Sequence, residues 1–221
     1  MNSRAKKGEE GIVSGVVRIV EEKIHPDIFT EFYRFLEESN ESLKSVTGYA
    51  IKTEFAKLAK AGSIESFRHI ERLIEDIDLG GIEKDFGIVA LNYCRFRIEN
   101  ELLDIQVDMV SGGLGGTANK IRYYMVLTGR DGITSDQLIE VEAVFKRAAD
   151  DRDSIIEEVK HHGFYVSLLI LGSLDYAIGD LLTTAISECK FLEEDYFLTN
   201  VEIPTDELIH DWLDGKLDET S

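Results

Sequence analysis

The second half of the chain alternates strand and helix patterns in an order that permits few folds. Two of its segments begin with helix start signals: Thr134 and Gln137 have the spacing of a capping box, and Asp175 precedes an amphipathic stripe. Runs rich in β-branched and aromatic residues separate these helices. The expected elements are a strand over 121–127, a helix from 134, strands over 155–160 and 164–171, a helix from 175 and a strand over 196–201.

This order, β-α-β-β-α-β, is that of the ferredoxin-like unit, in which helices cover one face of an antiparallel sheet. We therefore assign residues 119–203 to a ferredoxin-like unit. His161-His162-Gly163 joins its two middle strands. Adjacent residues of an extended chain point to opposite faces, and neither His-x-His nor His-Glu-x-x-His occurs, so we expect a polar turn here and no metal site.

Residues 1–80 are predicted to form a helical layer. Helices are expected from Pro26, over 46–61 with Gly62 as its end, and from Ser63, because apolar residues recur at three-to-four spacing after each start signal. Over 12–20 the apolar spacing also predicts a helix, and a strand is the alternative because most of these apolar residues are β-branched.

The pattern changes at Gly80-Gly81 from the helical period to a period of two. From 94 to 98 apolar residues alternate with Arg95 and Arg97, and a second alternating run ends at 109. We expect residues 81–118 to form a β-hairpin, with its turn at Asn100-Glu101, followed by a glycine-rich loop. The fold class is then α+β: a helical N-terminal layer, an antiparallel sheet and the ferredoxin-like unit. Residues 204–221 are expected to form a short amphipathic helix and an acidic tail.

The charge of the chain restricts its partners. Its 221 residues include 43 acidic and 24 basic ones, for a net charge of -19, which disfavours binding to phosphate backbones. No apolar run approaches the roughly 20 residues of a membrane span, and no secretion signal is visible, so we expect a cytoplasmic protein that does not enter membranes. Cys94 and Cys189 are expected to be buried free thiols, and no cofactor is expected.

The run from Ser111 to Lys120 is the most unusual local feature, with four glycines in five positions. A dinucleotide fingerprint needs a helix after the glycines, and here a strand pattern follows. We expect either a flexible connection between strands or a nest of backbone amides that binds an anion. The candidate anion-binding residues are Gly112, Gly113, Gly115, Gly116, Thr117, Asn119 and Lys120, with further positive charge from Arg95, Arg97 and Arg122.

In the order of its elements, the 119–203 segment resembles the single-stranded-DNA transposases, which use His-hydrophobe-His on a central strand and a tyrosine on a late helix. The corresponding positions in this chain are Tyr165-Val166-Ser167 and Trp212. The resemblance is one of element order, and it implies at most a degenerate nucleic-acid-processing domain.

The sequence contains no nucleophile with a base at a fixed offset, and this favours a non-catalytic interaction or regulatory protein. We expect it to self-associate or to bind a protein partner, because its tail helix is amphipathic and a sheet of this kind leaves edge strands exposed. The alternative is an enzyme or sensor that binds a small phosphate- or carboxylate-bearing metabolite at the glycine-rich loop. A degenerate nucleic-acid-processing domain is the weaker alternative.

Overall fold

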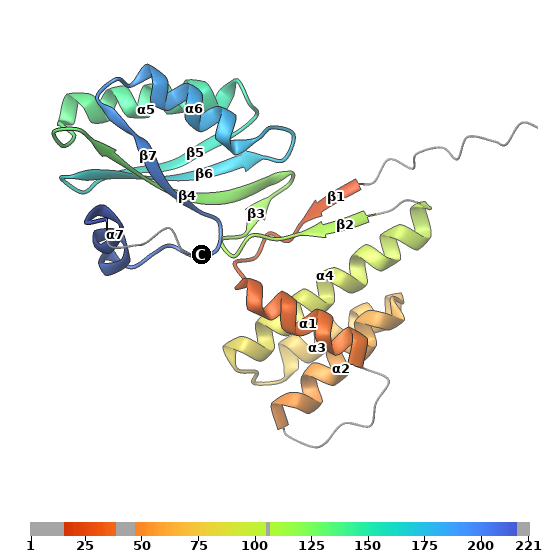
Figure 1. Ribbon diagram of the computed structural model, residues 1–221. Coiled ribbons are helices and arrows are strands. Elements are labelled where there is room, and N and C mark those ends of the chain that lie inside the picture. The colour runs from red at the N-terminus through yellow and green to blue at the C-terminus, as the bar shows by residue number, and fades with distance from the viewer. Residues whose placement is uncertain (1–15, 39–46, 105–106, 216–221) are drawn as a thin grey trace, which may run out of the picture.

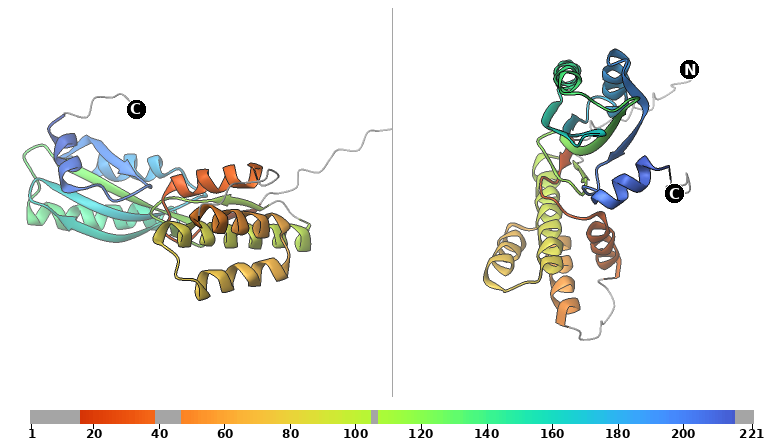
Figure 2. Two further views of the ribbon diagram at one scale, coloured as in Figure 1. Left: turned by 90° about the horizontal axis from the view of Figure 1, so that it is seen from below. Right: turned by 90° about the vertical axis from the view of Figure 1, so that its left-hand side faces the viewer.

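The computed structural model describes residues 16–38, 47–104 and 107–215, which combine helices with an antiparallel sheet, so the α+β prediction is confirmed. Figures 1 and 2 show a helical half, residues 16–38, 47–104 and 107–110, beside a sheet half, residues 116–215. Each half has its own large hydrophobic core. No helix in the described ranges combines the length and apolarity needed to cross a membrane.

Four helices and a two-stranded parallel ribbon form the helical half. Phe32, Phe35, Phe55 and Phe86 are fully buried at its centre. Ser63 caps its third helix, as predicted, by accepting a hydrogen bond from the Ser66 amide. The elements are β1 (Val16–Ile19), α1 (Pro26–Glu38), α2 (Thr47–Ala61), α3 (Ile64–Asp76), α4 (Gly81–Leu103) and β2 (Val107–Val110), with β1 parallel to β2.

The predicted β-hairpin after Gly80-Gly81 is wrong, because residues 81–103 form the long helix α4. The alternation around Arg95 and Arg97 covers only five positions, and this is too short to distinguish a period of two from one of 3.6. In addition, α1, α2 and α3 all pack against α4, so residues on several of its sides are buried and no single apolar stripe is visible. The segment over 12–20, for which a helix is predicted with a strand as the alternative, contains the strand β1, and its first residues lie outside the described ones.

Five strands form the sheet half, which runs from the glycine-rich loop to the C-terminal helix. The elements are β3 (Gly116–Thr117), β4 (Lys120–Gly129), α5 (Ser135–Asp150), β5 (Ile155–His161), β6 (Tyr165–Ser173), α6 (Ile178–Glu188), β7 (Leu192–Thr199) and α7 (Asp206–Leu213). All pairings are antiparallel: β4 lies between β6 and β7, and β5 pairs with the outer side of β6. The capping box of Thr134 and Gln137 is present at the start of α5.

Helices cover both faces of this sheet. Helices α5 and α6 bury one face around Met125, Leu127 and Phe145. Helix α7 packs on the opposite face (Figure 2). There Ile209 is 3% exposed, and the Trp212 ring lies 6.1 Å from the Phe197 ring. The apolar side of the tail helix is therefore used within the chain itself.

Candidate ligand site at the glycine-rich loop

The glycine-rich loop is a buried junction between the two halves. It lies against the connection from β1 to α1 and against the segment that follows β7. A Cβ atom on Gly113 would lie 2.0 Å from the Val201 carbonyl oxygen, and one on Gly115, whose φ is +70°, would lie 2.3 Å from the Glu21 carbonyl oxygen. These two positions need glycine because backbone approaches backbone there.

Several backbone amides of the loop already donate to oxygens of the protein. The Leu114 amide donates to the Asn200 carbonyl at 3.0 Å, and the Gly116 amide donates to the Glu21 carbonyl at 3.2 Å. The Ala118 amide donates to the Glu21 carboxylate at 3.3 Å. These bonds join the loop to both of its neighbours, so these amides are not free to bind an anion.

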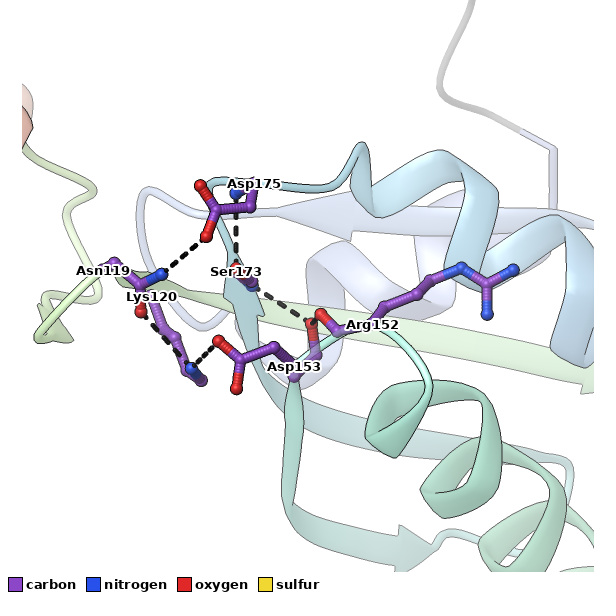
Figure 3. Close-up of polar contacts among 7 residues, drawn as sticks. Asn119, Lys120, Arg152, Asp153, Ser173 and Asp175 are labelled. Carbon is purple, nitrogen blue, oxygen red and sulfur yellow. Dashed lines mark hydrogen bonds and ion pairs between the residues drawn. The ribbon is translucent and has the colours of Figure 1, made fainter.

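Asn119 and Lys120 are brought together, but they face carboxylates (Figure 3). The Lys120 ammonium lies 2.7 Å from Asp153 and 3.3 Å from the Asn119 side-chain oxygen. The Asn119 amide donates to Asp175 at 3.1 Å. Beside them, the Ser173 backbone amide donates to the Ser154 hydroxyl, and this buried hydrogen bond ties the end of β6 to the residue before β5. The cation predicted to attract an anion is therefore neutralised within the protein.

Two of the three candidate arginines serve structural contacts. Arg122 forms a forked pair with Glu157, at 2.5 and 2.9 Å, and it also donates to the Leu114 carbonyl. The hydrogen bonds from Arg122 hold the pKa of Glu157 below its ordinary value, and the same bonds raise the pKa of Arg122. Arg97 donates to the Lys60 carbonyl at the end of α2, away from the loop.

Arg95 is the candidate arginine that lies in a cavity with the end of the loop. The cavity has a volume of about 520 Å³ and opens between β1, α4 and the loop; we call it the junction cavity. Arg18 and Glu99, which pair at 3.4 Å, lie on its wall. Its lining residues are Val17, Arg18, Ile19, Glu21, Glu22, Arg95, Phe96, Glu99, Ala118 and Asn119.

A buried amide connects two further charges of the junction cavity. The Asn92 side chain, 4% exposed, accepts a hydrogen bond from Arg95 at 2.5 Å and donates to the Glu22 carboxylate at 3.4 Å. The Arg95 guanidinium also lies over the Phe96 ring, 5.4 Å from its centroid. Sequence reasoning missed Glu22 and Asn92; the signal available was a polar Asn92 within the apolar run 88–94.

A hydrogen-bonded serine and histidine lie elsewhere, at the end of the sheet. The His162 ring nitrogen is 2.8 Å from the Ser167 hydroxyl, and the His162 ring stacks on Tyr165. Ser167 is only 3% exposed, so a substrate has no path to its oxygen. Among the described residues, no group of three histidines, cysteines or acidic residues is placed to hold a metal ion.

A second cavity, of about 670 Å³, lies between the end of α6 and β7 and includes Cys189. Burial and the neighbouring carboxylates of Glu140 and Glu188 raise the pKa of this thiol to about 11, so it is not a nucleophile near neutral pH. Its lining includes three charged residues, Arg130, Lys190 and Glu194, against five in the junction cavity.

Comparison with known proteins adds little to this geometry. No protein-family model matches the chain, and no curated protein matches it. One similar solved structure is described as that of "a putative transposase from Deinococcus radiodurans R1", with 12% identity and a TM-score of 0.38. The match covers 46% of this chain and 94% of that chain. A likeness of this extent assigns neither an activity nor a ligand to this protein.

Proposed function

We propose that the protein is a non-catalytic regulatory protein that binds a small ligand in the junction cavity. The observation that carries this proposal is the composition of the cavity wall, which takes Arg95 and Glu99 from α4 of the helical half and Asn119 from the start of the sheet half. Clefts between structural units, with a few converging polar groups, are where ligands commonly bind. The residues named on this wall include no serine, cysteine or histidine that could act as a nucleophile or as its base.

A ligand in this position contacts both halves at once. The bound ligand therefore favours one relative placement of the halves over others. Binding of a partner that recognises this placement is then controlled by the ligand. Occupancy at a hundred times the dissociation constant stabilises the bound arrangement by about 2.7 kcal/mol, which is enough to shift a two-state equilibrium by about a hundredfold. The glycine-rich loop transmits the shift because it is bonded to both halves.

Native mass spectrometry of the freshly purified protein tests the proposal, with the denatured mass as its reference. We expect a fraction of the protein to retain a mass of metabolite size, and this mass to be lost when Arg95 is replaced by glutamine. The Arg97→Gln variant is the matched control, because Arg97 lies on the same helix and bonds to the Lys60 carbonyl instead. A ligand-free spectrum from gently purified protein, together with no binding from a metabolite library, would contradict the proposal.

We also propose that residues 119–203 form a ferredoxin-like unit and that the protein self-associates through a sheet edge. The element order from β4 to β7, with β7, β4, β6 and β5 as neighbours in that order, supports the unit. The outer sides of β5 and β7 have no strand partner within the described ranges. Light scattering is expected to give a dimer or larger species, and a strict monomer at high concentration would count against self-association.

Two other expectations remain proposals from sequence. Cytoplasmic location is checked by cell fractionation. The hypothesis of a degenerate nucleic-acid-processing domain requires the protein to bind single-stranded DNA or RNA at physiological salt. The net charge of -19 disfavours such binding. A protein partner is sought by using the ligand-bound protein, since the ligand fixes the surface that a partner would recognise.

A further inference from the structure

The junction cavity holds two opposite charges that are not paired with each other. Arg95 and Glu22 are hydrogen-bonded to opposite ends of the Asn92 side-chain amide. Neither forms an ion pair with any described residue, whereas Arg18 and Glu99 in the same cavity do pair. Asn92 is in turn fixed by a bond to the Ile88 carbonyl, one turn back on α4, at 3.0 Å. The spacing between guanidinium and carboxylate is therefore set by a buried group.

The charges of the whole wall limit which ligands fit. Two arginines, Arg18 and Arg95, face three carboxylates, those of Glu21, Glu22 and Glu99. The Glu21 carboxylate accepts the Ala118 amide, and the Arg18–Glu99 pair is internally balanced. A simple anion beside Arg95 would also lie near Glu22, and like charges repel. A simple cation beside Glu22 would be repelled by Arg95 for the same reason.

A molecule with both charges satisfies both groups. Guanidinium binds a carboxylate through two parallel N–H bonds, and a carboxylate accepts hydrogen bonds from an ammonium group. Arg95 is exposed, but it donates to Asn92 and lies over the Phe96 ring, and these two contacts restrict the orientation of its planar group before the ligand arrives. Such preorganisation reduces the entropy lost on binding.

We propose that the ligand of the junction cavity is a zwitterion of the amino-acid class, with its carboxylate on Arg95 and its ammonium group on Glu22. This inference rests on the proposed function and specifies its ligand. It differs from the sequence-based expectation of a purely anionic metabolite, because the structure adds Glu22 and Asn92 to the site.

Isothermal titration of the intact protein with each standard amino acid tests the inference. The amino acid that binds most tightly is then compared with two analogues, one that lacks the amino group and one that lacks the carboxylate. We expect each analogue to bind about tenfold to a hundredfold more weakly, because each loses a charge-assisted hydrogen bond.

Variants at Arg95 and Glu22 show which of these residues contacts the carboxylate of the ligand and which contacts its ammonium group. In Arg95→Gln the amino acid should bind no better than the analogue without a carboxylate, and in Glu22→Gln no better than the analogue without an amine. Arg97→Gln and Glu71→Gln, which change charges on α4 and α3 outside the cavity, should leave affinity unchanged. Circular dichroism of all four variants checks that each is folded.

The outcomes separate this inference from the proposed function. Equal binding by an amino acid and one of its analogues, or a retained ligand without an ammonium group, overturns the zwitterion and leaves ligand regulation standing. Absence of binding by every amino acid overturns the zwitterion alone if native mass spectrometry finds another ligand. It overturns both proposals if no ligand is found by either method.

Discussion

Replacing Gly113 by alanine tests whether the glycine-rich loop is a structural junction. The new Cβ atom would lie 2.0 Å from the Val201 carbonyl oxygen and 2.7 Å from the carbonyl carbon, and both are backbone atoms that cannot rotate away. The two segments must separate by about 1.5 Å to restore ordinary contact distances. Overpacking of this kind typically costs 1–3 kcal/mol, and the adjacent hydrogen bond from Leu114 to Asn200 is strained at the same time. We expect the free energy of unfolding to fall by about 3 kcal/mol.

Urea denaturation measures this loss. The single tryptophan of the chain, Trp212, packs on Phe197 and so reports on the sheet half, while far-ultraviolet circular dichroism weights the helical half. Gly179→Ala is the control: Gly179 lies in α6 with open space around its Cβ position, and alanine there should stabilise the protein by up to about 1 kcal/mol. If the free energy of unfolding of Gly113→Ala differs by less than about 0.5 kcal/mol from that of the unchanged protein, the loop is not a tightly packed junction.

Three further changes follow from the same structure. The hydrogen bonds from Arg122 lower the pKa of Glu157, so this pair stabilises the fold above the ordinary carboxyl pKa and loses its effect as pH falls through the lowered pKa; Glu157→Gln should cost about 1 kcal/mol at neutral pH in urea titrations and progressively less as the pH is lowered. Because burial raises the pKa of Cys189 to about 11, its alkylation by iodoacetamide at mildly alkaline pH should be negligible until the protein is unfolded, and rapid native labelling would contradict this. Ile209→Ala removes a buried contact of α7 and should cost about 2–4 kcal/mol, with Trp212 emission shifted to longer wavelength; unchanged emission would show that α7 is held by other contacts.

Short-range signals predicted the structure well where a residue's local chemistry decides the outcome. The N-cap at Ser63, the positive φ of Gly62 at the end of α2 and the capping box at Thr134 are all present. Each depends on a few neighbouring residues and on hydrogen bonds within one turn. The antiparallel strands from β4 to β7 were also recognised, although β7 begins at Leu192 rather than at 196.

Helix α4 could not be recognised in the same way, because its burial comes from three other helices. Asn92 is an example: it is polar and buried, and one of the partners of its side-chain amide is Glu22, 70 positions earlier in the chain. The pairing of β1 with β2 is likewise a contact between distant segments. A pattern within one segment carries no information on which distant segment will cover it.

In the candidate site, too, some features follow from neighbouring residues in the sequence and others depend on distant segments. Arg95 and Asn119 were predicted as site residues, and the structure places both on the junction cavity. The sequence indicated neither that Lys120 and Arg122 would be paired with Asp153 and Glu157, nor that Glu22 would join the site. Partners for charged side chains are chosen by tertiary packing, so a count of basic residues near a loop overestimates the charge that a ligand meets.

The location of a bound ligand is the most direct test of the junction cavity as the functional site. Nuclear magnetic resonance of the unchanged protein can follow the Arg95 side-chain N–H and the Asn92 side-chain amide during titration with the amino acid that binds most tightly. We expect both signals to shift together with one dissociation constant, while the Arg97 side-chain N–H, bonded to Lys60, stays in place. Binding that moves Arg97 or the α6–β7 cavity around Cys189, and leaves Arg95 and Asn92 unchanged, would contradict the account.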